Sequence, residues 1–389
     1  MYNVKLYNKI SKVGLDKLDP AKYTCAEDFE DYDAVLVRSA KLHDVQFPKN
    51  LKCIARAGAG VNNIPLERCA QEGIVVFNTP GANANAVKEL VVCALMLASR
   101  KIVQGANWVQ SLAGTPDIGP AAEKGKATYA GPEIAGKKLG VIGLGAIGVK
   151  VANAAVGLDM EVWGYDPYLS VDGALALSRS VKHVTELDQI FANCDYITIH
   201  VPLTPDTKNT ICAETIAKMK DGVRIINLAR GELVDTKAMA EALESGKVAA
   251  YVSDFASDEI LAQPNAITLP HLGASTPESE GNCAMMAVKE ISDFLETGTI
   301  RNSVNFPNLK VPYEGGYRIC MIHKNIPNMI ASITGAVRCN IENMGNRSKG
   351  DFAYTIVDTA EAPTEATLAG PRATEGMISV RPLKAIYSI

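Results

Sequence analysis

The stretch 139–148 reads L-G-V-I-G-L-G-A-I-G and decides the fold around it. Its first residues are small or apolar, which predicts a buried strand, and the A-I-G-V-K-V-A-N-A-A that follows predicts a helix. Between them stand three glycines in a G-x-G-x-x-G pattern. Gly143 allows a tight turn, Gly145 lets a ligand approach the backbone, and Gly148 lets the helix pack closely on its strand.

The open N-terminus of this helix predicts a site for a dinucleotide. Free N–H groups and the helix dipole favour a phosphate there. A second predicted strand, Met160–Tyr165, ends at Asp166, which lies 18 residues after Gly148, near the spacing at which a carboxylate meets an adenosine ribose. That carboxylate would repel the 2′-phosphate of NADP, so the pattern favours NAD. The alternative is a glycine-rich turn without a ligand, which leaves the strand, the helix and the acid unexplained.

The composition is that of an ordinary globular protein. The 389 residues suffice for two or three domains, with 47% hydrophobic and 21% charged residues. A net charge of −4 gives no reason to expect nucleic acid or an anionic membrane as a partner. The first residues lack an apolar core of signal-peptide length, and the longest apolar run, 90–98, is too short to span a bilayer. Nine scattered cysteines without a C-x-x-C pair indicate reduced thiols and no metal site, so we expect a cytoplasmic protein.

Alternating strand-like and helix-like segments predict two doubly wound α/β domains with parallel sheets. Residues 1–95 and a returning helix within 277–310 form the predicted substrate domain, which is flavodoxin-like, and residues 96–276 form a Rossmann NAD domain. The expected strands of the two domains are 4–7, 34–38, 53–57 and 74–78, then 139–142, 160–165, 196–200, 223–228, 248–253 and 266–269. A polar segment, 111–136, is expected as a connection or surface insertion.

A third, smaller domain is predicted at 316–389, after a boundary rich in Asn, Pro and Gly. Its expected elements are a strand (317–323), a helix (327–337), two strands (340–344 and 352–358), a helix (363–368) and a strand (377–381). This β-α-β-β-α-β order is the ferredoxin-like split unit.

Three charged residues, Arg230, Glu259 and His271, follow predicted strands of the second domain. Because the carboxyl ends of parallel strands meet at one edge, we expect these side chains to converge beside the cofactor. A guanidinium can hold a carboxylate bidentately, an imidazole can take a hydroxyl proton as hydride leaves, and a carboxylate can orient that imidazole and raise its pKa. The set fits oxidation of an alcohol next to a carboxylate. For His200, at another strand end, shaping the cofactor site and simple packing are equal alternatives.

Six motifs resemble those of the D-2-hydroxyacid dehydrogenases, and the resemblance covers residues 1–305. They are A-R-A-G-A-G-V-N-N-I (55–64), F-N-T-P-G-A-N-A-N-A-V-K-E-L (77–90), G-V-I-G-L-G-A-I-G (140–148), G-Y-D-P-Y (164–168), I-N-L-A-R-G-E-L-V-D (226–235) and L-P-H-L-G-A-S-T (269–276). The resemblance implies an NAD-dependent dehydrogenase of a small 2-hydroxy acid. Within the family it is closest to enzymes that oxidise D-3-phosphoglycerate in L-serine biosynthesis.

The resemblance also implies roles for individual residues. Arg230, Glu259 and His271 take the catalytic positions. The implied cofactor contacts are Thr79, Gly143, Gly145, Ala146, Ile147, Gly148, Asp166, Val201, Leu228, Asp254 and Gly273. Arg56, with the backbone of Gly58 and Gly60, takes the position of a substrate-anion site, for which a surface salt bridge of Arg56 is the alternative.

The tail resembles an ACT regulatory domain, a small amino-acid-binding module. The matching residues are I-H-K-N-I-P-N-M (322–329), N-I-E-N-M (340–344) and A-Y-T-I-V-D (353–358). His323, Asn325 and Asn340 match positions that hold L-serine between two copies, which implies a serine effector and a homodimer or homotetramer. A domain used only for dimer contact is the alternative, because Asn328 stands where the pattern usually has Gly.

Two rival functions remain open. One is another reductase of the same family, acting on glyoxylate, hydroxypyruvate or a longer 2-keto acid. The other is an NAD-sensing protein that binds partners without catalysis, which turnover of a 2-hydroxy acid would exclude. The intact catalytic set disfavours a purely structural subunit.

Overall fold

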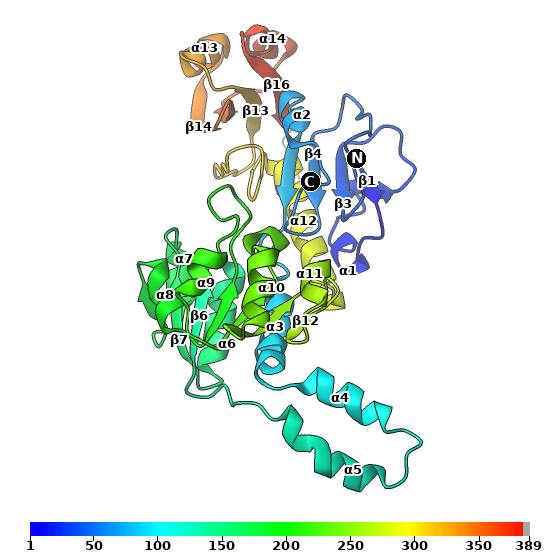
Figure 1. The fold of residues 1–389 in the computed structure, drawn as a ribbon. Helices are drawn as coiled ribbons and strands as arrows, with labels where there is room; N and C mark the ends of the chain where they lie inside the picture. The colour runs from blue at the N-terminus through cyan, green and yellow to red at the C-terminus, as the bar shows by residue number, and fades with distance from the viewer. Residues whose placement is uncertain (384–389) are drawn as a thin grey trace. The chain divides into compact units, whose positions relative to one another are not determined.

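The computed structural model describes residues 1–383, which divide into two compact units (Figure 1). The first unit comprises Met1–Ala82 and the chain from Glu280 onward, and the second comprises Asn83–Ser279. Each unit is built on its own parallel sheet, and a third, antiparallel sheet follows at the C-terminal end. The predicted α/β class is therefore confirmed. The sequence-based boundary at residue 95 falls inside helix α3 (Ala84–Ser99) of the second unit.

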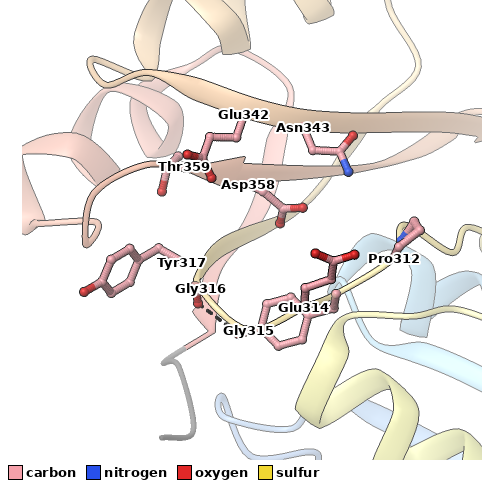
Figure 2. A pocket seen from close by; sticks show the side chains of 10 residues that line it. Pro312, Glu314, Gly315, Gly316, Tyr317, Glu342, Asn343, Asp358 and Thr359 are labelled. Atoms are coloured by element: carbon pink, nitrogen blue, oxygen red, sulfur yellow. Dashed lines mark hydrogen bonds between the residues drawn. The ribbon is translucent and has the colours of Figure 1, made fainter.

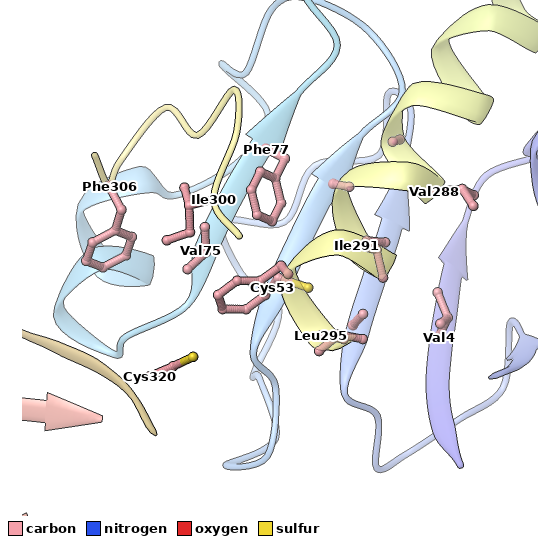
Figure 3. Close-up of a cluster of buried hydrophobic side chains, with 14 of the residues drawn as sticks. Val4, Cys53, Val75, Phe77, Val288, Ile291, Leu295, Ile300, Phe306 and Cys320 are labelled. Atoms are coloured by element: carbon pink, nitrogen blue, oxygen red, sulfur yellow. The ribbon is translucent and has the colours of Figure 1, made fainter. Parts of the chain in front are cut away.

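The sheet of the first unit has five parallel strands in the order β2-β1-β3-β4-β5, which is the flavodoxin-like order. The strands are β1 (Tyr2–Tyr7), β2 (Tyr23–Ala26), β3 (Ala34–Val37), β4 (Cys53–Arg56) and β5 (Val75–Asn78), with short helices α1 (Lys12–Leu15) and α2 (Leu66–Gln71). Helix α12 (Pro277–Thr297) covers one face, where Ile291 and Leu295 pack with Val4, Cys53 and Phe77 (Figure 3). Strand β2 was not predicted, because only its first residue is buried and it shows no apolar pattern.

The sheet of the second unit has seven parallel strands in the order β12-β11-β10-β9-β6-β7-β8. They are β6 (Lys138–Ile142), β7 (Glu161–Tyr165), β8 (Lys182–Val184), β9 (Tyr196–Ile199), β10 (Val223–Asn227), β11 (Val248–Ser253) and β12 (Ala266–Thr268). Helices α3 and α6 (Ala146–Val156) pack on one face, and α8 (Leu187–Asn193), α9 (Ala213–Ala217) and α10 (Thr236–Glu244) pack on the other. The prediction of six strands was wrong by one, since β8 has only three residues, two of them exposed.

The chain from Ile102 to Tyr129, which overlaps the segment 111–136 expected as a polar connection, folds as a helical hairpin. It contains α4 (Ile102–Ser111), α5 (Ile118–Gly125) and the 3-10 helix η1 (Lys126–Tyr129), none of which has a buried residue. The rings of Trp108 and Tyr129 stack with their centroids 5.1 Å apart. Contacts within the hairpin therefore hold it together.

The C-terminal region has the predicted β-α-β-β-α-β order. Its elements are β13 (Tyr317–Lys324), α13 (Met329–Ala336), β14 (Ile341–Lys349), β15 (Phe352–Thr359), α14 (Glu365–Ala373) and β16 (Met377–Leu383), with the strand order β14-β15-β13-β16. One face of the sheet, including Ile319 and Met321, packs under α13 and α14. The other face contributes Ile322 and Tyr354 to the core that α12 forms with the first sheet.

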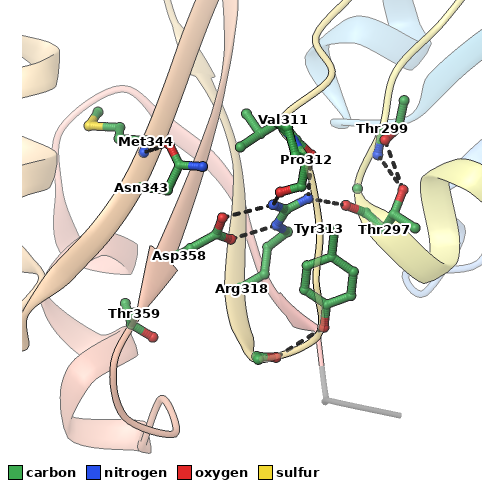
Figure 4. Close-up of polar contacts among 12 residues, drawn as sticks. Thr297, Thr299, Val311, Pro312, Tyr313, Arg318, Asn343, Met344, Asp358 and Thr359 are labelled. Carbon is green, nitrogen blue, oxygen red and sulfur yellow. Dashed lines mark hydrogen bonds and ion pairs between the residues drawn. The ribbon is translucent and has the colours of Figure 1, made fainter.

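Two arginines, Arg318 and Arg381, join this small sheet to the rest of the first unit. Arg318 has a fully buried side chain, and its guanidinium pairs with Asp358 at 2.6 and 2.8 Å (Figure 4). The same group donates to the carbonyl oxygens of Thr297, Val311 and Pro312. Arg381 donates to two carbonyl oxygens in the last turn of α12, where a cation is favoured.

A buried carboxyl lies beneath the loop that follows α12. Glu290 is 4% exposed, its Oε1 accepts a hydrogen bond of 2.8 Å from the Asn302 amide, and its Oε2 has no hydrogen-bond partner among residues 1–383. Burial raises the pKa of Glu290 to about 8. Glu290 therefore carries a proton at neutral pH.

We expect this proton to make the stability of the chain depend on pH. The unfolded state loses the proton near pH 4.5, whereas the folded state keeps it to about pH 8, so the free energy of unfolding falls as pH rises across that window. Glu290→Gln should remove a slope of at most about 1.4 kcal/mol per pH unit, measured by urea unfolding at several pH values. Glu365→Gln, at an exposed carboxylate, is the control. An unchanged slope in Glu290→Gln would contradict a protonated Glu290.

Candidate functional site

The turn between β6 and α6 has room for a ligand at one glycine and for no side chain at the other two. Gly143 has φ 92°, and a Cβ there would lie 2.7 Å from the carbonyl oxygen of His200. A Cβ on Gly148 would lie 1.8 Å from the carbonyl oxygen of Gly143. Around the Cβ position of Gly145, the N-cap of α6, no atom lies within 4 Å. The turn is therefore closed against its sheet and open at the helix N-terminus, which fits a phosphate.

An acid is fixed beside this turn. Asp166 follows β7, and its Oδ2 accepts a hydrogen bond of 2.8 Å from the N–H of Leu144, inside the turn. Its Oδ1 accepts one of 2.8 Å from the N–H of Tyr168. The first residues of α6, Ala146 and Ile147, share the same corner. The structure thus brings the glycine turn and the predicted ribose-binding acid together.

A buried carboxylate lies at the carboxyl end of β11. Asp254 is 4% exposed, and neither of its carboxylate oxygens has a hydrogen-bond partner among residues 1–383. Burial raises the pKa of Asp254, while His271 and then Arg230 act in the opposite direction. The Cβ position of Gly273 lies 3.7 Å from its Oδ2. An unpartnered buried carboxylate is unfavourable, so the site fits a ligand that donates hydrogen bonds, such as an amide.

Asn227 is a residue that the sequence interpretation missed. It is fully buried at the end of β10, and its amide donates 2.8 Å to the carbonyl oxygen of Arg230. Its Oδ1 accepts from the N–H of Ala229 at 3.2 Å. Both bonds hold the loop that carries Arg230, whose own side chain is exposed. The available signal was a polar residue inside the apolar run I-I-N-L-A, next to the buried Leu228.

His271 and Glu259 lie near Asp254 in sequence but are not joined to each other. His271 is exposed in the loop after β12, and its ring contacts Phe255 edge-on at 5.0 Å between centroids. Glu259 is exposed in the first turn of α11 (Asp258–Leu261), where its own N–H and the Ser257 hydroxyl lower its pKa. No hydrogen bond or ion pair links Glu259 to His271 in the described chain. The acid that acts on His271 here is Asp254.

His200 is a packing residue in this structure. Its Nε2 lies 3.0 Å from the hydroxyl of Thr198, and burial lowers the pKa of His200 to about 4. The ring is therefore neutral at pH 7. The backbone of His200, followed by Val201, closes the glycine turn against Gly143.

A second cluster of predicted site residues lies in the first unit, in the turn after β4. The Nε of Arg56 donates 3.0 Å to the carbonyl oxygen of Arg38. A Cβ on Gly58 would lie 2.5 Å from Nη1 of Arg56, so the guanidinium lies over this glycine. The N–H of Thr79 donates 3.1 Å to the Gly58 carbonyl, and its buried hydroxyl has no partner within 1–383. With Gly60 in the same turn, these groups form a compact candidate anion site.

The buried His323 has partners on both ring nitrogens. Nδ1 lies 2.8 Å from the carbonyl oxygen of Lys324, and Nε2 lies 2.8 Å from the hydroxyl of Thr355, which also accepts from Asn346 at 2.7 Å. Burial lowers the pKa of His323. Its ring is a structural part of the small sheet.

The other two predicted effector residues lie apart. The Asn325 amide donates 3.0 Å to the carbonyl oxygen of Gly350, near His323. Asn340 is exposed just before β14, at the end of the sheet where Ile341 pairs with Thr359. That end is opposite to His323 along β13. Within one chain the three residues therefore do not form one site.

A pocket of about 260 Å³ opens near the start of β13 and carries three carboxylates, those of Glu314, Glu342 and Asp358 (Figure 2). None of the predicted site residues lines it. Residues 1–383 contain no cluster of three or more His, Cys, Asp or Glu side chains placed to hold a metal. Over the same residues, no helix is both long and apolar enough to cross a membrane.

Comparisons with known proteins agree with this geometry. The family "D-isomer specific 2-hydroxyacid dehydrogenase, NAD binding domain" matches residues 92–273. The D-3-phosphoglycerate dehydrogenase of Archaeoglobus fulgidus is 38% identical over 289 residues, which are 72% of this chain and 52% of that protein. The chain thus spans about half the length of the curated relatives it matches.

Solved structures show the same fold. The NAD⁺-bound 3-phosphoglycerate dehydrogenase of Entamoeba histolytica is 28% identical, with a TM-score of 0.63 over 79% of this chain and 99% of that one. A glyoxylate reductase from a Paecilomyces species is 25% identical, with a TM-score of 0.63 over 78% and 98% of the two chains. Residues 92–273 are therefore an NAD-binding domain, and the open glycine turn, Asp166 and Asp254 fit that cofactor.

Substitutions at the glycines of this turn can distinguish a ligand contact from a packing contact. Gly145→Ala places its methyl group in open space, so we expect an unfolding free energy within about 0.5 kcal/mol of wild type and NAD binding weakened about tenfold or more. Gly148→Ala should instead destabilise the second unit, because its methyl group meets a backbone carbonyl. Gly119→Ala in α5, also in open space, is the control. NAD titration and urea unfolding measure both effects; unchanged NAD affinity in Gly145→Ala would contradict the site.

Proposed function

We propose, because the chain belongs to the D-2-hydroxyacid dehydrogenase family, that it oxidises D-3-phosphoglycerate to 3-phosphohydroxypyruvate with NAD. The observation that carries the proposal is the grouping of Arg230, Asp254 and His271 at the carboxyl ends of β10, β11 and β12. A cation for a carboxylate and an imidazole for a proton are the two groups that oxidation of a 2-hydroxy acid requires.

The proposed reaction assigns one task to each group. Arg230 binds the substrate carboxylate, and His271 takes the hydroxyl proton as the C2–H bond breaks. The nicotinamide of NAD, if bound at this edge, would supply the hydride acceptor. Asp254 is the carboxylate proposed to attract the imidazolium that results, since His271 acts against the effect of burial on the pKa of Asp254. Glu259 is the further acid proposed to orient His271. To reach the imidazole ring, it requires a shift of α11 or of the loop that carries His271.

The cofactor is proposed to bind along the edge of the second sheet. The turn of Gly143, Gly145 and Gly148 with Ala146 and Ile147 would receive the pyrophosphate, and Asp166 the ribose hydroxyls. Asp254 would accept hydrogen bonds from the nicotinamide amide. The remaining proposed contacts are Val201, Leu228, Gly273 and Thr79.

The phosphate of the substrate needs a separate cation, and Arg56 with the N–H groups of Gly58 and Gly60 is the proposed group. This assignment makes residues 1–95 with 277–310 the substrate domain, 96–276 the NAD domain and 316–389 an ACT-like regulatory domain. L-Serine is the proposed effector of the last. The nine free cysteines support a reducing compartment, and we place the protein in the cytoplasm.

The second candidate is a reductase of unphosphorylated 2-keto acids. The similarity to a glyoxylate reductase favours it, since the fold and the catalytic edge are compatible with both substrates. The two candidate functions differ in whether Arg56 binds a phosphate group of the substrate.

NADH-linked kinetics test the proposal. We expect kcat/KM for 3-phosphohydroxypyruvate to exceed that for hydroxypyruvate and glyoxylate by about 100-fold, the effect of a charge-assisted bidentate contact. His271→Ala should lower kcat by about 100-fold or more and leave NAD affinity unchanged, because it removes only the proton acceptor. Equal rates on all three acids would support the second candidate, and no turnover at all would support a binding protein. Added serine in the same assay tests the effector.

The helical hairpin supports a homodimer or homotetramer. Its exposed apolar side chains, Ile102, Val103, Val109 and Ile118, are 38–47% exposed, and a surface of this kind commonly packs against a second copy. Asp substitutions at Ile102 and Val109 together should convert the oligomer to monomers in sedimentation velocity. Val171→Asp, at an exposed valine outside the hairpin, is the control. A monomeric wild-type chain would contradict the proposal.

A further inference from the structure

A basic depression lies where the loop after α12 meets β14. It has a volume of about 480 Å³ and is lined by Thr299, Ile300, Arg301, Asn308, Leu309, Lys310 and Arg347. Three of these residues are cationic and none is acidic. The size is that of a small-molecule site.

The three cations of this depression lack local neutralisation. Arg301, Lys310 and Arg347 are exposed, and within residues 1–383 none of them forms an ion pair with a carboxylate. Arg301 lowers the pKa of Glu290, but burial keeps that carboxyl protonated at neutral pH. Like charges gathered around one depression raise its potential and favour an anion.

The walls of the depression are fixed in place. Ile300 and Leu309 form a two-way backbone bridge, with N–H to carbonyl distances of 2.9 and 3.0 Å. On the β14 side, Lys349 donates 2.9 Å to the carbonyl oxygen of Val304. A Cβ on Gly345 would lie 2.6 Å from Val311, so the strand packs closely on the loop. The cations therefore stand on a preorganised surface, which lowers the entropic cost of binding.

The same loop reaches the candidate substrate turn through hydrogen bonds. Asn302 follows Arg301, and its carbonyl oxygen accepts from the N–H of Asn78 at 3.3 Å. The Asn78 amide donates 2.6 Å to the carbonyl oxygen of Ala59, between Gly58 and Gly60. Val304 also pairs with Val76 of β5 at 2.9 Å. A ligand that shifts the loop would thus shift the turn that holds Arg56.

We propose that this depression is an effector site for a small polyanion carrying phosphate or carboxylate groups, and that its occupancy changes substrate affinity through Asn302 and Asn78. The coupling part of this inference rests on the proposed function of the Gly58–Gly60 turn. The binding part does not.

Calorimetric titration of the full chain with inorganic phosphate, and separately with citrate, tests the binding part at matched ionic strength. We expect the Arg301→Gln, Arg347→Gln double variant to bind the preferred anion about tenfold more weakly than wild type, as loss of two charge-assisted contacts implies. Arg338→Gln, at an exposed arginine outside the depression, is the control. Anion bound at Arg56 is common to all variants and cancels in the comparison. Stronger binding of phosphate than of citrate identifies a phosphorylated effector, and the reverse identifies a polycarboxylate.

Identical titrations for wild type and the double variant, or equal weakening in Arg338→Gln, would overturn the site. Steady-state kinetics then test the coupling: the anion should change KM for the keto acid at least about threefold in wild type and not in the double variant, with kcat little changed. If the double variant loses anion binding but the anion does not change KM in wild type, the coupling is overturned. If the chain shows no dehydrogenase turnover, the titrations still decide the site.

Discussion

The approach of backbone to backbone at the first turn of the NAD domain constrains the rest of the structure. The carbonyl oxygen of His200 closes on Gly143, and that of Gly143 closes on Gly148, so two neighbouring strands and a helix meet without side chains between them. This contact fixes the direction of α6 and leaves its N-terminus open at Gly145. The ends of β10, β11 and β12 then line the same sheet edge, which places Asp254 beside His271 and Arg230. The proposed cofactor site and the proposed catalytic groups both depend on this steric condition.

The sequence predicted those parts of the fold that strong local patterns encode. Apolar runs located ten of the twelve parallel strands, and the missed strands, β2 and β8, are short edge strands with one buried residue each. The segment 111–136 was predicted as a connection because it is polar and contains Gly and Pro, yet it includes helix α5, which has no buried residue. Contacts between residues that lie far apart in the sequence were harder to predict. Three such features depend on burial, which the spacing of residues does not encode. They are the electrostatic interaction between Asp254 and His271, the hydrogen bonds by which Asn227 holds the Arg230 loop, and the protonation of Glu290.

The C-terminal sheet belongs to the core of the first unit. Tyr354 and Ile322 share a hydrophobic cluster with α12, and Arg318 and Arg381 bind carbonyl oxygens at and beyond the end of that helix. The proposed regulatory module, attached in this way, can act on the candidate substrate turn by small shifts of packed elements, without a large domain movement. The loop that carries Arg301 and Asn302 is bonded through Val304 to both β5 and β14, and this position supports the effector site proposed for the basic depression.

We propose that hydride passes from C2 of a 2-hydroxy acid to the cofactor at the open glycine turn. D-3-Phosphoglycerate that carries deuterium at C2, incubated with NAD and the purified chain, tests this transfer. We expect the deuterium to appear in the reduced nicotinamide and to be transferred more slowly than hydrogen. Deuterium released to water, or consumption of the acid without reduction of NAD, would contradict it.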